Sequence, residues 1–214
     1  MPERKQGLWI AFEGNDGSGK STQLKQYADY LTREGGLDVV VTREPGGNPY
    51  SEKLRSLIFD GEVSEDGETQ LLLFTAARRR NIRQTVLPAL NEGKIVLSDR
   101  SQGSTFAYQH FQFGIPWEMV ATINTFATEG VQPDYTFLLD VDIPVGLARM
   151  QQAKGIEANH FDNAAMEDLF KRREGYLKLA EILPNWIVIN ANNDQDTVMR
   201  DIVEATRSKI LKLS

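Results

Sequence analysis

The residues best suited to chemistry lie in one short stretch near the start of the chain. Positions 14–21 carry glycines at 14, 17 and 19, followed by Lys20 and Ser21. This is the G-x-x-x-x-G-K-S pattern of a phosphate-binding loop. The glycines let backbone N–H groups face a polyphosphate, Lys20 can reach its β- and γ-phosphates, and the Ser21 hydroxyl can ligate Mg²⁺. A chance match in a glycine-rich turn is the alternative.

The sequence on either side of this loop fits a nucleotide site. Residues 8–12 (LWIAF) form an apolar run that predicts a strand. Leu24, Tyr27, Ala28 and Leu31 recur at helical spacing, which predicts a helix that starts near Gly19. The N-terminus of such a helix adds a partial positive charge at the phosphate site. Because both flanks fit, a true phosphate loop is favoured over a chance match.

Composition narrows the class of protein. The chain has 214 residues, of which 41% are hydrophobic and 25% charged, so we expect one domain over 1–214 with a short lid. The net charge of −6 argues against general binding to nucleic acid or membrane surfaces. The absence of Cys excludes disulfides and thiolate metal sites. With no signal-like N-terminus and no long apolar run, a cytoplasmic protein is expected.

Strand-like runs alternate with helical runs along the chain. This order predicts an α/β fold with a central five-stranded parallel sheet flanked by helices. After the first strand, strands are expected at 38–42, which reads as buried, and at 94–98, 135–140 and 186–189. Helices are expected after the first one at 50–59, 68–91, 115–128, 144–151 and 197–211, and the polar segment 152–163 is expected to form the lid.

Charged side chains follow two of the predicted strands, where ligands of open α/β sheets bind. Arg43 is placed to meet an anion, although an ordinary turn with a surface Arg is the alternative. Asp99 can act on Mg²⁺ through water or orient an acceptor phosphate that Arg100 holds. Phe74 and Arg78 share a helix face and can stack on a planar base and bond its edge, unless they are a core Phe and a solvated Arg.

Taken together, these motifs resemble the thymidylate kinase family over nearly the whole chain. The phosphate loop alone indicates only a nucleotide. The stretch 42–47 (TREPGG) and the later Asp-Arg and Ala-Tyr-Gln motifs are much more specific. The resemblance rests on residues 42–47, 73–74, 77–78, 99–100, 104, 107–109, 133–134, 139–142 and 147–149.

The resemblance implies a P-loop NTPase fold and a homodimer that moves the γ-phosphoryl group of ATP to dTMP, giving dTDP, with Mg²⁺. Residues implied to hold ATP are Gly14, Asn15, Asp16, Gly17, Ser18, Gly19, Lys20, Ser21, Thr22 and, beside the lid, Arg149. Residues implied to be catalytic are Lys20, Asp16, Arg43, Asp99 and Arg100, and Ser21 with Asp99 would serve the metal.

The same resemblance implies the dTMP site. Asp16 would contact the 3′-hydroxyl, Arg43 and Arg100 would hold the phosphate, and Tyr108 would crowd the 2′ position and favour deoxyribose. Phe74 would stack on thymine while Arg78 bonds its edge. Ser104, Thr105 and Gln109 complete the set of residues implied to bind this substrate.

The chain departs from the family pattern at one catalytic position. Members carry an Arg in the phosphate loop or in the lid, but here the loop has Gly17-Ser18 and His160 stands at the lid position. Lys154, Arg149 or protonated His160 could substitute for it. Two other functions stay open: a kinase for another deoxynucleoside monophosphate or a nucleoside, and, supported only by the missing Arg, a nucleotide-binding protein that has lost catalysis.

Overall fold

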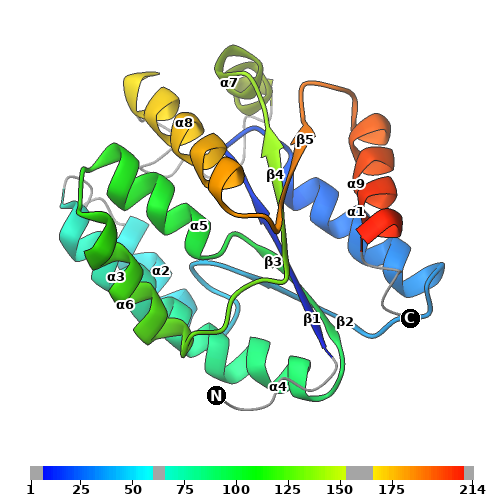
Figure 1. The fold of residues 1–214 in the computed structure, drawn as a ribbon, viewed down its shortest axis with the longest axis horizontal. Coiled ribbons are helices and arrows are strands. Elements are labelled where there is room, and N and C mark those ends of the chain that lie inside the picture. Colours follow the sequence, from blue (N-terminus) through cyan, green and yellow to red (C-terminus); the bar gives the residue numbers. More distant parts are fainter. Residues whose placement is uncertain (1–6, 60–65, 153–165, 210–214) are drawn as a thin grey trace.

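A parallel β-sheet forms the centre of the molecule. A computed structural model describes residues 7–59, 66–152 and 166–209. Within these ranges five parallel strands are arranged in the order β2-β3-β1-β4-β5 (Figure 1). The strands are β1 (Leu8–Glu13), β2 (Val39–Arg43), β3 (Ile95–Asp99), β4 (Tyr135–Asp140) and β5 (Trp186–Asn190). The predicted five-stranded parallel sheet is confirmed.

The apolar run of β1 occupies the centre of the sheet. Trp9, Ile10 and Phe12 are each at most 1% exposed, because helices cover both faces. The one polar atom of the Trp9 ring is satisfied: Nε1 donates to Ser98 Oγ on β3 at 2.8 Å. The register aligns Phe12 with Asp99, so the end of β3 lies beside the start of the phosphate loop.

The strand expected at 38–42 is present as β2, but the expectation that it is buried is wrong. β2 is an edge strand that pairs only with β3 within the described sheet. Val41 is 53% exposed, whereas Thr42 is buried. A run of β-branched residues predicts a strand by propensity, but it does not say how many neighbours the strand will have.

Helices pack on the two faces of the sheet, α1 and α9 on one and most of the others on the opposite face (Figure 1). The helix expected at 68–91 is continuous but changes type, with a π-helical turn at Ile82–Val86. None of the helices within the described ranges is long and apolar enough to cross a membrane. The α-helices are α1 (Lys20–Arg33), α2 (Pro49–Phe59), α3 (Gly67–Asn81), α4 (Leu87–Asn91), α5 (Gln102–Thr105), α6 (Trp117–Thr128), α7 (Ile143–Gln152), α8 (Met166–Ile182) and α9 (Gln195–Lys209), and a second π-helix, η2, spans Phe106–Gln112.

The expected lid at 152–163 lies, apart from its first residue, outside the described part of the chain. The same is true of Lys154 and His160. Its neighbours are described: α7 ends at Gln152 and α8 begins at Met166.

Candidate active site

The phosphate loop joins β1 to α1 and its backbone requires glycine. Gly14 and Gly17 have φ values of +137° and +80°. A Cβ at Gly14 would lie 2.4 Å from the carbonyl oxygen of Leu139, and one at Gly17 would lie 2.2 Å from that of Gly146. The loop therefore packs directly against the end of β4 and the backbone of α7, and neither glycine tolerates a side chain.

Lys20 is the first residue of α1 and its side chain is folded back over the loop. The side chain is 7% exposed, and Nζ donates to the carbonyl oxygen of Asn15 at 2.9 Å. Nζ also lies 3.9 Å from Asp16 Oδ1. Burial, assisted by the positive charge of Arg100, lowers the pKa of Lys20 to about 8, even though Asp16 opposes the shift. Lys20 is therefore a buried cation at the phosphate loop, with its charge only partly balanced by Asp16.

This pKa predicts a pH dependence for the use of ATP. Lys20 attracts phosphate only when it is protonated, so its charge is present below about pH 8 and is lost as the pH rises through that value. We expect kcat/KM for ATP, which reports on the free enzyme, to fall above about pH 8. A profile measured from pH 6 to 10 that stays flat to pH 9.5 would contradict the assignment.

Ser21 and Asp99 present oxygen atoms at the mouth of the phosphate loop. The Ser21 hydroxyl donates to Oδ2 of Asp99, the last residue of β3. Hydroxyl and carboxylate oxygens suit Mg²⁺, which takes few protein ligands and fills its octahedron with water and phosphate oxygens. The site thus has the donors that a Mg²⁺–nucleotide requires.

Arg100 connects the phosphate loop to the end of β3. It has a left-handed backbone, with φ at 70°, and its side chain is 16% exposed. Its Nη1 donates to Tyr176 Oη at 2.9 Å and to Ser104 Oγ at 3.1 Å, and its Nη2 donates to Asp16 Oδ1. Burial alone would raise the pKa of Asp16, but Arg100 and Lys20 together lower it. Asp16 therefore stays ionised between two cations.

Arg43, at the end of β2, is turned toward α2. Its Nε and Nη2 donate to the two carboxylate oxygens of Glu52 at 3.2 and 2.8 Å, and the side chain is 53% exposed. Glu52 also accepts from the Gly47 backbone N–H at 3.0 Å, which ties the 43–47 turn to α2. Arg55, which belongs to no motif in the sequence, donates to the Pro45 carbonyl from the same turn region. Burial and the charge of Arg43 lower its pKa.

Arg78 is buried, so the alternative of a solvated Arg is wrong. The side chain is 2% exposed. Its Nε donates to Glu44 Oε2 at 2.6 Å, Nη1 donates to Thr105 Oγ1 at 2.6 Å and to Asn124 Oδ1, and Nη2 donates to the Ser101 carbonyl at 2.9 Å. These bonds tie α3 to α5, α6 and the turn after β2. The four bonds use four of the five guanidinium donors.

Two of the residues expected at the base and sugar, Phe74 and Tyr108, lie in one hydrophobic cluster. Tyr108 is 6% exposed, and partly buried Phe74 packs against the same hydrophobic cluster. Two guanidinium groups lie over the Tyr108 ring, Arg172 at 4.3 Å and Arg100 at 5.6 Å from the centroid. Arg172 is 1% exposed and was missed by the sequence analysis, although it falls on the buried face of α8 with Tyr176. Gln109 is also buried and donates to Gln70 Oε1 at 3.4 Å.

The hydrogen bonds of Arg149 go to the loop after β5 and not to the phosphate loop. Its Nη1 donates to the Ala191 carbonyl at 2.7 Å and its Nη2 to the Asn193 carbonyl at 3.1 Å. It therefore anchors α7 to the loop that follows β5.

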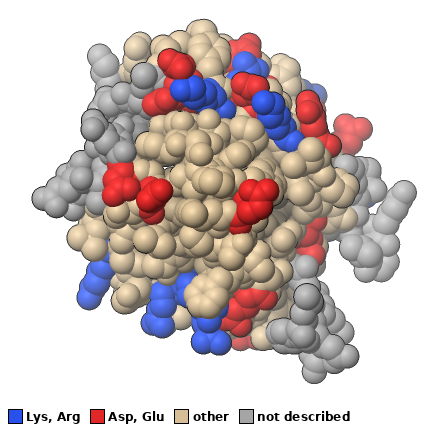
Figure 2. Space-filling view, turned by 60° about the vertical axis from the view of Figure 1, so that its left-hand side comes forward, with Lys and Arg blue, Asp and Glu red and all other residues tan. Residues whose placement is uncertain are grey.

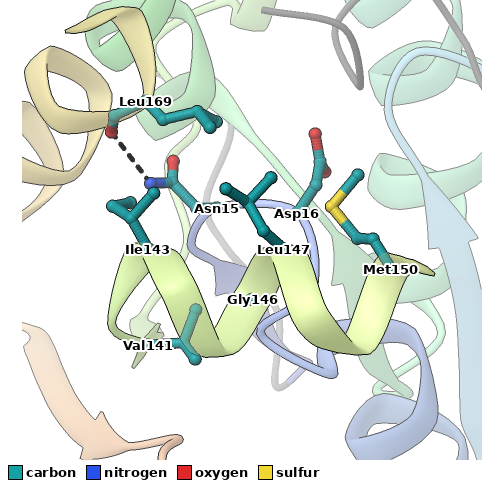
Figure 3. Close-up of a pocket in the computed structure, with 8 residues that line it drawn as sticks. All are labelled: Asn15, Asp16, Val141, Ile143, Gly146, Leu147, Met150 and Leu169. Atoms are coloured by element: carbon teal, nitrogen blue, oxygen red, sulfur yellow. Dashed lines mark hydrogen bonds between the residues drawn. The ribbon is translucent and has the colours of Figure 1, made fainter. Parts of the chain in front are cut away.

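A hollow lies between the phosphate loop, α7 and α8 (Figure 3). Asn15 spans it, since Nδ2 donates to the Leu169 carbonyl at 3.0 Å. The phosphate loop is thereby fastened to the helix that follows the expected lid. The lining residues are Asn15, Asp16, Val141, Ile143, Gly146, Leu147, Met150 and Leu169.

A parallel sheet, a strand–phosphate loop–helix unit and cations at neighbouring strand ends define a P-loop phosphotransferase. The thymidylate kinase family model matches residues 12–202. The chain is 41% identical over 206 residues to a thymidylate kinase of Geobacillus sp. (strain WCH70), covering 95% of this chain and 98% of the relative. It is 41% identical over 208 residues to one from Enterococcus faecalis, covering 97% of each. The chain belongs to the thymidylate kinase family.

A solved structure agrees with this assignment. The crystal structure of thymidylate kinase from Ehrlichia chaffeensis matches with a TM-score of 0.77 and 32% sequence identity. The match covers 93% of this chain and 98% of that one. The expected P-loop NTPase fold is confirmed.

Proposed function

We propose that the chain transfers the γ-phosphoryl group of ATP to dTMP and releases ADP and dTDP. One observation carries this proposal. Lys20, the cation of the phosphate loop, and Arg100, the cation at the end of β3, meet at the same oxygen, Oδ1 of Asp16. If Lys20 serves the donor and Arg100 the acceptor, their shared carboxylate would bring the two phosphate groups close enough for direct transfer.

On the donor side, the protein supplies positive charge and orientation. The backbone N–H groups of the phosphate loop, the N-terminus of α1 and Lys20 would hold the ATP phosphates. Ser21 and Asp99 would hold Mg²⁺, which neutralises charge on the phosphates. In phosphoryl transfer such positioning and charge neutralisation supply most of the rate.

On the acceptor side, Arg43 and Arg100 would bind the dTMP phosphate, with Arg55 close behind. Arg43 is exposed and bonded to Glu52, and an exposed ion pair of this kind is worth little, so a phosphate can replace it. Asp16 would bind the 3′-hydroxyl and hold the sugar in register with the loop.

For the base, we assign Phe74 to stacking and the fifth N–H of Arg78 to the thymine edge. Tyr108 would exclude a 2′-hydroxyl, because Arg100 and Arg172 hold its ring in place. Arg149, already bonded to the loop after β5, would border the adenine end of ATP.

The proposal is tested by the products of a reaction with ATP, Mg²⁺ and dTMP, separated by anion-exchange chromatography. We expect ADP and dTDP in equal amounts. ADP without dTDP would indicate an ATPase, and binding of both nucleotides without products would indicate a homologue that has lost catalysis.

We further propose a homodimer that uses the outer face of α3 and α6. Leu72 on α3 and Met119 and Phe126 on α6 are 59%, 47% and 77% exposed. Figure 2 shows a wide area of uncharged residues on this side of the molecule, interrupted by a few acidic side chains, with Lys and Arg gathered toward its margins. A large exposed apolar face of this kind marks an interface.

Phe126→Glu is expected to convert the dimer to a monomer, because it places a charge at the most exposed apolar side chain of this face. The measurement is molar mass by light scattering during size exclusion. Phe170→Glu is the matched control, since Phe170 is 52% exposed on α8, and it should leave the mass unchanged. An unchanged mass for Phe126→Glu would place the interface elsewhere.

A further inference from the structure

Glu13, the last residue of β1, is a buried carboxylate that has no part in the proposed reaction. It is 0% exposed and lies directly before the phosphate loop. Burial raises its pKa, although the charge of Arg100 and hydrogen bonds from Ser104 and Ser101 act in the opposite direction. A carboxylate is costly to bury, so its partners indicate what it is for.

The partners of Glu13 all belong to the segment that follows Arg100. Oε1 accepts from the backbone N–H and the hydroxyl of Ser101, at 2.8 and 3.1 Å, and from the backbone N–H of Ser104, at 3.0 Å. Oε2 accepts from the Ser104 hydroxyl at 2.6 Å. One carboxylate therefore fixes the start of α5 against the end of β1.

Arg100 needs such support. Its φ of 70° is costly for a residue with a side chain, so the surrounding structure must hold it there. Its backbone N–H donates to the Phe12 carbonyl at 2.9 Å, immediately before Glu13. Its Nη1 donates to the same Ser104 hydroxyl that donates to Glu13. Glu13 thus acts on the turn that contains Arg100 and, through Ser104, on the guanidinium itself.

The fit of α5 against this carboxylate leaves no room for adjustment. A Cβ at Gly103 would lie 2.9 Å from Glu13 Oε1 and 2.7 Å from the Trp186 ring. Gly103 is therefore enclosed between the carboxylate and Trp186 of β5, so the segment 101–104 packs tightly against β1.

We propose that Glu13 is a positioning residue that holds Arg100 for the acceptor phosphate through Ser101 and Ser104. The proposal rests on the role assigned to Arg100 in the proposed function. Its alternative is a carboxylate that only stabilises the fold.

The test is Glu13→Gln, which keeps the shape and removes the negative charge and one strong acceptor. We expect KM for dTMP to rise roughly 10- to 100-fold, as for the loss of hydrogen bonds to a charged group, with KM for ATP within about 2-fold. The change in the midpoint of thermal unfolding should be small, because relief of the buried charge offsets the weakened hydrogen bonds. A lower midpoint with an unchanged KM for dTMP would overturn the proposal.

Asp134→Asn is the matched control. Its carboxylate accepts the Trp9 backbone N–H at 2.7 Å, at the opposite end of β1. Loss of this charge should leave the KM for dTMP unchanged. If Glu13→Gln does not fold, Ser101→Ala removes one of the four donors and should raise the KM for dTMP about 3-fold.

A double-mutant cycle separates this proposal from the proposed function. If Glu13 acts through Arg100, Glu13→Gln should cost little further activity in an Arg100→Ala background. The same loss in both backgrounds would overturn the positioning role alone. Unchanged dTMP kinetics in Arg100→Ala itself would overturn the acceptor role of Arg100 and this proposal with it.

Discussion

Lys20→Met is expected to lower kcat about 1000-fold or more while the protein stays folded. Lys20 is the phosphate-loop cation that lies within 4 Å of Asp16, and a cation fixed on a transferring phosphoryl group is worth about 10³–10⁵ in rate. Methionine fills a similar volume without the charge. A 1000-fold loss corresponds to about 4 kcal/mol of transition-state stabilisation.

The measurement is steady-state kcat with saturating ATP and dTMP, alongside thermal unfolding. Stability should not suffer, because Lys20 pays a desolvation cost that lowers its pKa to about 8. Lys25→Met is the control on the same helix, since Lys25 is exposed, and it should behave as wild type. A Lys20→Met enzyme within 10-fold of wild type would remove Lys20 from the mechanism.

Arg100→Ala is expected to lower kcat/KM for dTMP about 1000-fold and to change KM for ATP little. The guanidinium bonds Asp16, Ser104 and Tyr176 and lies over the Tyr108 ring. Its loss removes the cation proposed to bind the acceptor phosphate and also leaves Asp16 with one fewer cation. Removing one member of a buried charge pair typically costs several kcal/mol.

Kinetics with each substrate varied separately will show whether the loss falls on the acceptor. Arg100→Lys keeps the charge but not the forked geometry, so it should recover part of the activity. Arg83→Ala is the surface control, since Arg83 is 58% exposed and pairs with Glu129. Equal losses of kcat/KM for ATP and dTMP in Arg100→Ala would mean that Arg100 supports the whole phosphate loop and is not specific to the acceptor.

The elements that carry the site could be predicted from sequence because their signals are local. The phosphate loop requires glycine, lysine and serine at fixed spacing, and the strands are short apolar runs. Asp99 and Arg100 follow directly from their position after a strand, because the carboxyl ends of parallel strands meet at one edge.

The partners of Arg78 could not be predicted, because they come from distant parts of the chain. Glu44, Thr105 and Asn124 are 27 to 46 residues away from it. The π-helical turns, such as Ile82–Val86, have no sequence signal of their own. Glu13 was overlooked because it follows an apolar strand and its importance appears only in its contacts with residues 101–104.

The most direct test of the central claim is an ADP-release assay with ATP and Mg²⁺ against a panel of acceptors. The panel contains dTMP, dUMP, dCMP, dGMP and the ribose form of TMP at equal concentrations. We predict strong turnover of dTMP, with weak turnover of the ribose form if Tyr108 has the proposed role of crowding the 2′ position. Preferred turnover of another monophosphate would contradict the roles given to Phe74, Arg78 and Tyr108, and an absence of turnover with every acceptor would contradict the kinase itself.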